Sequence, residues 1–257
     1  MTESATQNTF QITSATNNQF EIWKSLTTSK GIKEHKQFFL MGEKLVEEFL
    51  AKPVDSFNIE YIIHDQEITF KKNIKKTLLS RELFKELDVL GTNSPLLVLS
   101  FKDFKEKKFS EAALGLELIC PLGDPRNLGA LIRSGVGFGV YEIILTKEST
   151  HPFLPHAIKA SAGAALKAKF SKTSSSISEI PLVGENYALA LFGENISSIK
   201  WPKNLRLWVG EEGPGLNLEH SQKKTMKFVN IPTEEIESLN AMVSTSLAIW
   251  EWKKQNA

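Results

Sequence analysis

Five short apolar segments lie at intervals along the second half of the chain, and they constrain its fold more than any other feature. They are LGLELIC (114–120), YEIILT (141–146), YALALF (187–192), LRLWVG (205–210) and MKFVNIP (226–232). The stretches between them are long enough for helices or turns, and strands joined through helices pair in parallel. Their nearly continuous apolar character predicts a largely parallel sheet covered on both faces, which is an α/β fold.

The first half of the chain has a different pattern of polar and apolar residues. A polar leader rich in Thr, Asn, Gln and Ser occupies residues 1–17, where a frayed or loosely docked segment is expected. Helical and extended patterns then alternate over residues 18–101, which predicts a small α/β domain. Residues 102–114 are charged and poor in large apolar side chains, so we expect a linker there. The larger domain is therefore expected over residues 115–257.

Composition excludes several classes of protein. The 31 Lys and Arg residues balance 30 Asp and Glu residues, so a nucleic-acid partner can be argued only from local patches. One patch, TFKKNIKK (69–76), is either a solvated face or a track for phosphates. The single cysteine, Cys120, excludes an internal disulfide framework, and the histidines lack metal-ligand spacing, so no metal is expected. The polar start and the absence of any apolar run near ~18 residues predict a cytoplasmic protein with no membrane span.

The segment GDPRNLGALIRSGVGFGV (123–140) is the first of three that suggest chemistry. An Asp-Pro turn opens it, and Asn127 is expected to cap the helix that follows. Apolar residues at helical spacing over residues 128–136 predict one buried face. Arg133 is offset from that face by about 100°, so it is either a surface charge or a group that reaches a pocket. The glycines follow a helix with GxGxG spacing, which does not fit a dinucleotide-binding turn.

The second segment, LWVGEEGPGLN (207–217), ends a strand in a glycine-rich turn. Gly210 and Gly213 allow the backbone to approach a ligand closely, although a plain turn would have the same composition. The segment lacks the Lys-Ser/Thr ending of a phosphate-binding loop. Glu212 would suit a cationic or hydroxyl-bearing ligand better than a nucleoside triphosphate.

The third segment, VNIPTEEIESLNAMVSTSLAIWEWKKQ (229–255), contains a final helix that is predicted to begin near Ser238. Ser238 is a candidate cap for this helix, and both Ser238 and Asn240 are either capping residues or part of a site. The helix carries an apolar stripe, which consists of Leu239, Val243, Leu247 and Trp250. Small and hydroxyl-bearing residues occupy the neighbouring face, where they allow close packing.

In this order, the three segments resemble the signature of the SpoU/TrmH family of SPOUT methyltransferases. DPRNLGALIR…FGV is similar to the first motif, VGEEGPGL to the second and VNIP…ESLNAMV to the third. KASAGA (159–164) is also similar to the family, and the resemblance covers residues 115–257. Residues 18–101 resemble, less closely, the L30e-like substrate-binding domain that often precedes the catalytic domain.

The resemblance implies an enzyme that transfers a methyl group from S-adenosylmethionine to a ribose 2′-hydroxyl of RNA, with ribosomal RNA preferred to transfer RNA. It also implies a SPOUT domain with a trefoil knot near the carboxy-terminus and a homodimer. The catalytic residues that it implies are Asn127, Arg133, Glu212, Ser238 and Asn240. The cofactor contacts that it implies are Phe192, Gly193, Gly210, Gly213, Ile231 and Leu239. Because a guanidinium hardly deprotonates, our hypothesis is that Arg133 holds the phosphate beside the target ribose.

Two features depart from the family's motifs. The segment IPTEEIESLN (231–240) is shorter and more acidic than usual, which leaves the shape of the cofactor loop open. Gly135 and Gly137 stand where alanine-like residues are usual, and each should loosen its helix by about 1 kcal/mol. Two other functions stay open: an RNA-binding or ribosome-assembly protein that keeps the fold without catalysis, and a nucleotide-dependent oxidoreductase. The absence of GxGxxG disfavours the oxidoreductase.

Overall fold

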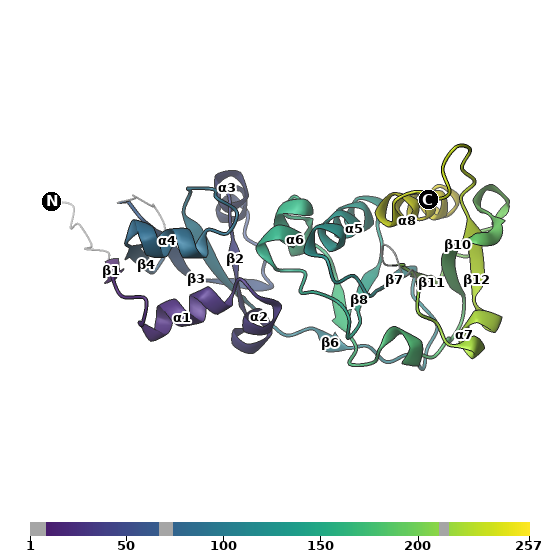
Figure 1. The fold of residues 1–257 in the computed structure, drawn as a ribbon, viewed down its shortest axis with the longest axis horizontal. Helices are drawn as coiled ribbons and strands as arrows, with labels where there is room; N and C mark the ends of the chain where they lie inside the picture. The colour runs from purple at the N-terminus through teal and green to yellow at the C-terminus, as the bar shows by residue number, and fades with distance from the viewer. Residues whose placement is uncertain (1–8, 67–73, 211–215) are drawn as a thin grey trace. The chain divides into compact units, whose positions relative to one another are not determined.

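A computed structural model describes residues 9–66, 74–210 and 216–257 of the chain. The described residues form two compact units, whose elements are labelled in Figure 1. The first unit comprises the described residues up to Asp103 together with Phe153–Lys159, and the second comprises Phe104–Pro152 and Ala160–Ala257. None of the described helices is both long and apolar enough to cross a membrane.

The first unit contains a mixed sheet whose described strands have the order β1-β4-β3-β5-β2. These strands are β1 (Thr9–Ile12), β2 (Gln37–Leu40), β3 (Phe57–His64), β4 (Lys76–Leu79) and β5 (Leu96–Phe101). The helices are α1 (Asn18–Ser25), α2 (Ser29–His35), α3 (Glu43–Ala51) and α4 (Arg81–Leu87), and all of α6 (Pro155–Ala160) except its last residue. This α/β unit agrees with the expected fold class, whereas its L30e-like identity stays a prediction.

The polar leader expected over residues 1–17 is ordered in its described part. Thr9–Ile12 forms strand β1, which pairs in parallel with β4 along its whole length. Ile12 is buried, and Asn17 caps α1 by accepting hydrogen bonds from the backbone of the first turn. A docked edge strand therefore replaces the loose segment that the polar composition favoured.

The second unit is built on a sheet whose described strands are all parallel, in the order β12-β10-β11-β7-β8-β9-β6. The strands are β6 (Lys105–Glu106), β7 (Leu116–Cys120), β8 (Glu142–Leu145), β9 (Phe170–Lys172), β10 (Asn186–Asn195), β11 (Leu205–Trp208) and β12 (Lys227–Asn230). The longer helices are α5 (Pro125–Phe138), α7 (His220–Thr225) and α8 (Ala241–Asn256), and the single-turn helices are η1 (Ala164–Leu166), η2 (Ile177–Glu179) and η3 (Ile196–Ser198).

All five apolar segments predicted as strands are strands of this sheet, so the predicted parallel α/β fold is confirmed. The core lies along the middle strands, where Leu118, Ile119, Ile144 and Trp208 have no exposed surface. Side chains buried on both faces explain why these segments are apolar without alternation. The trefoil knot stays a prediction.

The linker expected over residues 102–114 belongs to the second unit from Phe104 onward, so that expectation is corrected. Lys105–Glu106 forms β6, and Phe109 and Ala113 are buried. The charged segment that suggested a linker forms ion pairs inside the unit. Lys107 Nζ lies 2.7 Å from Glu117 Oε1 and 2.6 Å from Glu142 Oε2.

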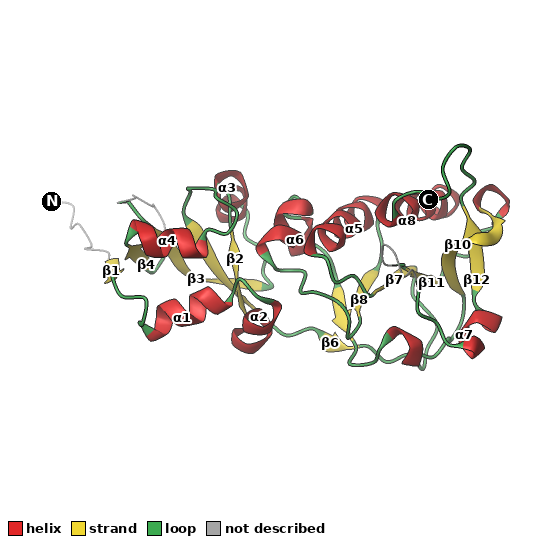
Figure 2. Ribbon diagram, in the orientation of Figure 1, coloured by secondary structure: helices red, strands yellow, loops and turns green. Residues whose placement is uncertain are grey.

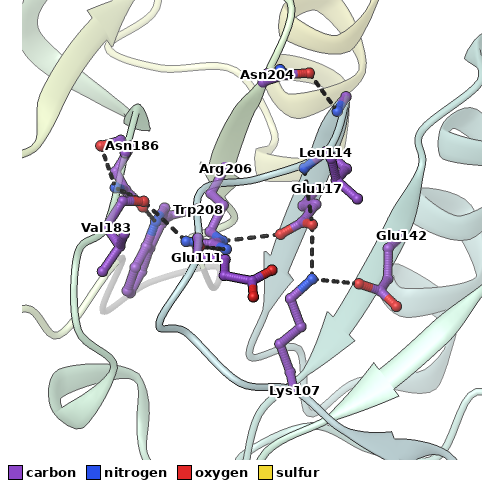
Figure 3. A network of polar contacts seen from close by, with 12 residues as sticks. Lys107, Glu111, Leu114, Glu117, Glu142, Val183, Asn186, Asn204, Arg206 and Trp208 are labelled. Carbon is purple, nitrogen blue, oxygen red and sulfur yellow. Dashed lines mark hydrogen bonds and ion pairs between the residues drawn. The ribbon is translucent and has the colours of Figure 1, made fainter.

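Glu117 lies at the centre of a buried polar network (Figure 3). Its Oε2 accepts a hydrogen bond from Arg206 Nε at 3.0 Å, and both side chains are 1% exposed. The guanidinium of Arg206 also donates to the carbonyl oxygens of Val183 (3.0 Å) and Glu111 (2.8 Å). The network therefore ties segment 107–114 to the amino-terminal ends of strands β7, β8 and β11.

Candidate active site

A cavity of about 680 Å³ lies in the second unit, where strands β11 and β12 end and helix α8 begins. Its lining consists of Leu189, Ala190, Leu191, Gly210, Val229, Asn230, Ile231, Ser238, Leu239, Asn240, Ala241, Ser244 and Thr245. Parallel strands bring their carboxyl ends to one edge of a sheet, which is where open α/β sheets usually bind ligands. None of these lining residues carries a charged side chain.

Strand β10 forms one wall of the cavity because its pairing with β12 is irregular. Leu189 pairs with Val229, and Glu194 pairs with the same residue after the irregularity. The residues between them, which include Ala190 and Leu191, leave the regular ladder, as in a β-bulge. Gly193 permits this path, because a Cβ atom there would lie 2.5 Å from the backbone of β12.

Helix α8 contributes its first turns to the lining of the cavity. Asn240 caps this helix, since its Oδ1 accepts hydrogen bonds from Met242 N (2.9 Å) and Val243 N (3.3 Å). The prediction that Ser238 is the cap is therefore wrong. Ser238 lies outside the helix, in the cavity wall.

The hydroxyl groups of α8 that line the cavity bond to the helix itself. Thr245 Oγ1 donates to Ala241 O at 2.7 Å, and Ser244 Oγ lies 3.1 Å from both Asn240 O and Ala241 O. Because each hydroxyl has one proton, these side chains are left to accept hydrogen bonds from a ligand.

Helix α5 begins directly after strand β7, the neighbour of β11 in the sheet. Its cap is Asp124, whose Oδ1 accepts from Arg126 N (2.8 Å) and Asn127 N (2.9 Å), so the prediction that Asn127 is the cap is wrong. The expected buried face is confirmed for Leu128, Leu131 and Ile132, which have no exposed surface, whereas Val136 at its end is half-buried.

Arg133 points away from the buried face of α5 and is exposed. No hydrogen bond or ion pair joins its guanidinium to another residue in the described part of the chain. Ser134, the next residue, lies 2.8 Å from Ser246 of α8, measured between the two Oγ atoms. Figure 2 shows α5 and α8 as neighbouring helices, so Arg133 lies one residue away from a direct contact with the helix that lines the cavity.

The predicted site residues fall into three groups. Five of them line the cavity: Gly210, Ile231, Ser238, Leu239 and Asn240. Four others lie outside the lining: Asn127 and Arg133 on α5, and Phe192 and Gly193 beyond Leu191 on β10. The ring of Phe192 packs on Phe228 at a centroid distance of 4.8 Å. Glu212 and Gly213, like Lys71 and Lys72 of the lysine patch, lie outside the described residues.

The sequence did not single out the β10 wall or Thr245. YALALF is typical of a buried strand, and nothing in it marks the register change that exposes Leu191 to 54%. Among the described residues, no group of three or more His, Cys, Asp or Glu could hold a metal ion. The cavity therefore offers apolar walls, strand-end backbone and hydroxyl acceptors, which suit a small ligand with an apolar ring and polar substituents.

A family model, described as the SpoU rRNA methylase family, matches residues 118–250 of the chain. The matched stretch includes the whole of α5 and every residue that lines the cavity.

Individual proteins show the same likeness. The chain is 30% identical over 252 residues to ribosomal RNA small subunit methyltransferase G 2 of Syntrophobacter fumaroxidans, a match that covers 96% of this chain and 50% of that protein. It is 26% identical over 247 residues to the 23S rRNA (guanosine(2553)-2'-O)-methyltransferase RlmP of Bacillus subtilis, with 93% and 98% covered. The chain thus spans half of the first relative and nearly all of the second.

Among solved structures, the SpoU methyltransferase AviRb of Streptomyces viridochromogenes in complex with AdoMet superposes with a TM-score of 0.75. The identity is 16%, and the superposition covers 93% of this chain and 98% of AviRb. At this identity, the likeness establishes the shared fold.

Proposed function

We propose, since this chain belongs to the SpoU rRNA methylase family, that it transfers the methyl group of S-adenosylmethionine to a ribose 2′-hydroxyl of RNA. The observation that carries the proposal is the cavity at the strand ends, which lies within the matched region. Relatives named as 23S rRNA 2′-O-methyltransferases support ribosomal RNA as the substrate, in preference to transfer RNA. Such a substrate implies a reaction in the cytoplasm.

The lining residues fit the cofactor chemically. S-adenosylmethionine, when bound, supplies an electrophilic methyl group on a positively charged sulfur. Leu189, Val229 and Leu239 supply apolar surface for a ring, while Ser244 and Thr245 supply hydroxyl acceptors. None of the described lining residues has a cationic side chain, so a positive ligand meets no like charge from them.

Arg133 has the chemistry to bind the acceptor RNA. Its planar guanidinium can hold a phosphate oxygen pair bidentately. Held beside the target ribose, it would offset the negative charge that develops on the 2′-oxygen. The exposure of Arg133 and its lack of a partner among the described residues support this role.

The other predicted residues are proposed to orient the reactants. Asn127 would fix Arg133 or the ribose from the first turn of α5. Ser238 presents a hydroxyl from the cavity wall, and Asn240 holds the start of α8 through its capping bonds. Glu212 and Gly213 are kept as proposed site residues on the grounds of the sequence motif.

Methyl transfer is tested by mapping 2′-O-methylated positions in total RNA from cells with and without the protein. At least one ribosomal RNA position should lose its methyl group when the protein is absent. Calorimetry with S-adenosylmethionine separates the enzyme from a non-catalytic RNA-binding relative, because the non-catalytic protein should take up little cofactor. An unchanged methylation map together with no cofactor binding would contradict the proposal.

Filling the cavity should weaken cofactor binding. Ala190→Phe places a large ring at the β10 wall, and we expect at least a tenfold weaker affinity for S-adenosylmethionine, which is about 1.4 kcal/mol. Calorimetry measures the change, with Ala51→Phe at an exposed end of α3 as the matched control. Equal affinities in the two variants would mean that the ligand binds elsewhere.

We also propose a homodimer that buries the apolar stripe of α8. Val243, Leu247 and Trp250 are 50%, 40% and 46% exposed, although they are spaced along one helical stripe. The ring of Phe138 on α5 extends the stripe, at 5.4 Å from the ring of Trp250. A second copy of the chain, related by a twofold axis, would cover this surface. Arg133 on the adjacent helix would then act at the cavity of its own protomer or at that of the partner.

Placing a charge in this stripe should separate the two copies. Leu247→Asp would bury an unpaired carboxylate in the interface, so sedimentation should show a monomer where the unchanged protein is a dimer. Val89→Asp is the matched control, because Val89 is 41% exposed in the first unit, outside the stripe. An unchanged protein that sediments as a monomer would rule out the dimer.

A further inference from the structure

We propose that Ser134 and Ser246 are positioning residues, whose hydrogen bond sets the rotation of α5 and thereby aims Arg133 at the cavity. The inference rests on the proposed methyl transfer, because Arg133 is the group that is aimed. It concerns two residues outside the predicted site.

The hydroxyl of Ser246 bridges the two helices. It donates to Ser134 Oγ on α5 at 2.8 Å and to the carbonyl oxygen of Met242 on its own helix at 2.7 Å. One proton is shared between the two acceptors, as in the three-centre bonds common in helices. Ser134 is therefore linked to the first turn of α8.

The same turn of α8 is held from the cavity side. Met242 N donates to Asn240 Oδ1 at 2.9 Å, and Asn240 and Ala241 line the cavity. The amide N–H of Met242 thus takes part in the cap at the cavity wall. Its carbonyl oxygen accepts from Ser246, which bridges to α5. A shift of α5 relative to α8 would therefore act on α8 within one helical turn of the residues that line the cavity.

The serine bridge supplies a directional contact that the apolar packing between these helices lacks. Phe138 and Trp250 meet as rings 5.4 Å apart, and such contacts tolerate sliding because hydrophobic attraction has no direction. The two serines are half-buried, which protects their bond from competition by water.

A small rotation of α5 would misplace Arg133. With its side-chain atoms about 5 Å from the helix axis, a turn of about 20° moves the guanidinium by about 2 Å. Misplacement by about 1 Å is enough to cost up to a hundredfold in rate. Loss of the bridge should therefore affect the chemical step more than binding.

The test compares Ser134→Ala, Ser246→Ala and the double variant in methyl transfer to ribosomal RNA. Each single change should lower kcat about tenfold, with KM for RNA and Kd for S-adenosylmethionine within about twofold of the unchanged protein. The double variant should be no slower than either single variant, since both remove the same bond. Ser246→Thr keeps the hydroxyl and should restore most of the rate.

Thr225→Ala is the control, because Thr225 is exposed on α7 and its hydroxyl donates to the carbonyl oxygen of Ser221 in the same helix. Thermal melting checks each fold; if Ser246→Ala unfolds, Ser134→Ala carries the comparison. Single variants with kcat within twofold of the unchanged protein, or losses that add in the double variant, would overturn the positioning role alone. An unchanged protein that methylates no RNA would instead overturn the proposed function, and the positioning role with it.

Discussion

Replacing Arg133 with alanine is expected to lower kcat for RNA methylation by about a thousandfold, the scale seen when a group that stabilises developing charge is removed. The affinity for S-adenosylmethionine should stay within about twofold, because Arg133 does not line the cavity. The free energy of unfolding should change by less than about 0.5 kcal/mol, since the side chain is exposed and has no partner among the described residues. Single-turnover transfer and calorimetry measure the two effects separately.

Two matched variants sharpen this result. Arg126→Ala removes the same charge from an exposed position on the same helix, and it should retain most of the activity. Arg133→Lys keeps the charge but loses the planar fork, so it should recover only a small part of the rate if phosphate is held bidentately. Near-full transfer by Arg133→Ala, with normal cofactor binding, would remove Arg133 from the mechanism.

Replacing Glu117 with alanine should destabilise the second unit by about 3–5 kcal/mol, the cost of leaving a buried charge without its partner. The guanidinium of Arg206, 1% exposed, would lose the carboxylate that accepts from its Nε, and Lys107 would lose one of its two carboxylates (Figure 3). Urea denaturation monitored by tryptophan fluorescence measures the effect.

An exposed ion pair provides the comparison. Lys227 lies 2.6 Å from Glu185, and this hydrogen bond raises the pKa of Lys227, yet both side chains are largely exposed. Glu185→Ala should therefore cost less than about 1 kcal/mol. A loss of similar size in the two variants would show that burial of the Glu117 network contributes little.

The sequence predicted the strands that are apolar throughout and missed short edge strands, one of them in each sheet, for a physical reason. A strand buried on both faces, such as Leu116–Cys120, must be apolar throughout, and this can be seen in the residues alone. Thr9–Ile12 and Lys105–Glu106 are short strands at the sheet margins whose polar residues carry no comparable pattern. Charged residues suggested a linker where Lys107 in fact pairs inside the unit.

The starts of α5 and α8 were predicted to within three residues, but their capping residues were not. Asp124 and Asn127 are both good caps, and so are Ser238 and Asn240, so residue type alone does not choose between them. The backbone decides: the residue with extended φ and ψ whose side chain reaches the second and third amides is the cap, which is Asp124 for α5.

The α8 stripe shows the limit of periodicity. The pattern identifies Leu247 and Trp250 as neighbours on one face, yet the face packed inside the unit is the one with Thr245 and Ala248. Thr245 and Ala248 allow this face to approach closely, and the large apolar side chains Met242, Ile249 and Trp252 are buried with them. The residues of the predicted stripe stay at the surface instead. The cavity wall at Leu191 escaped prediction for a related reason, because a register irregularity in a strand leaves no mark on an apolar run.

The attachment of segment 107–114 to the strand ends bears on how the carboxy-terminal unit can be isolated. A recombinant fragment that starts at Leu116 would discard the ammonium group of Lys107 and the carbonyl of Glu111 while keeping Glu117, Glu142 and Arg206 in the interior. In such a fragment, Glu117, Glu142 and Arg206 would each lack a hydrogen-bonding partner that they have in the full chain. A fragment that begins at Phe104 would keep Lys107 and Glu111, and with them these partners.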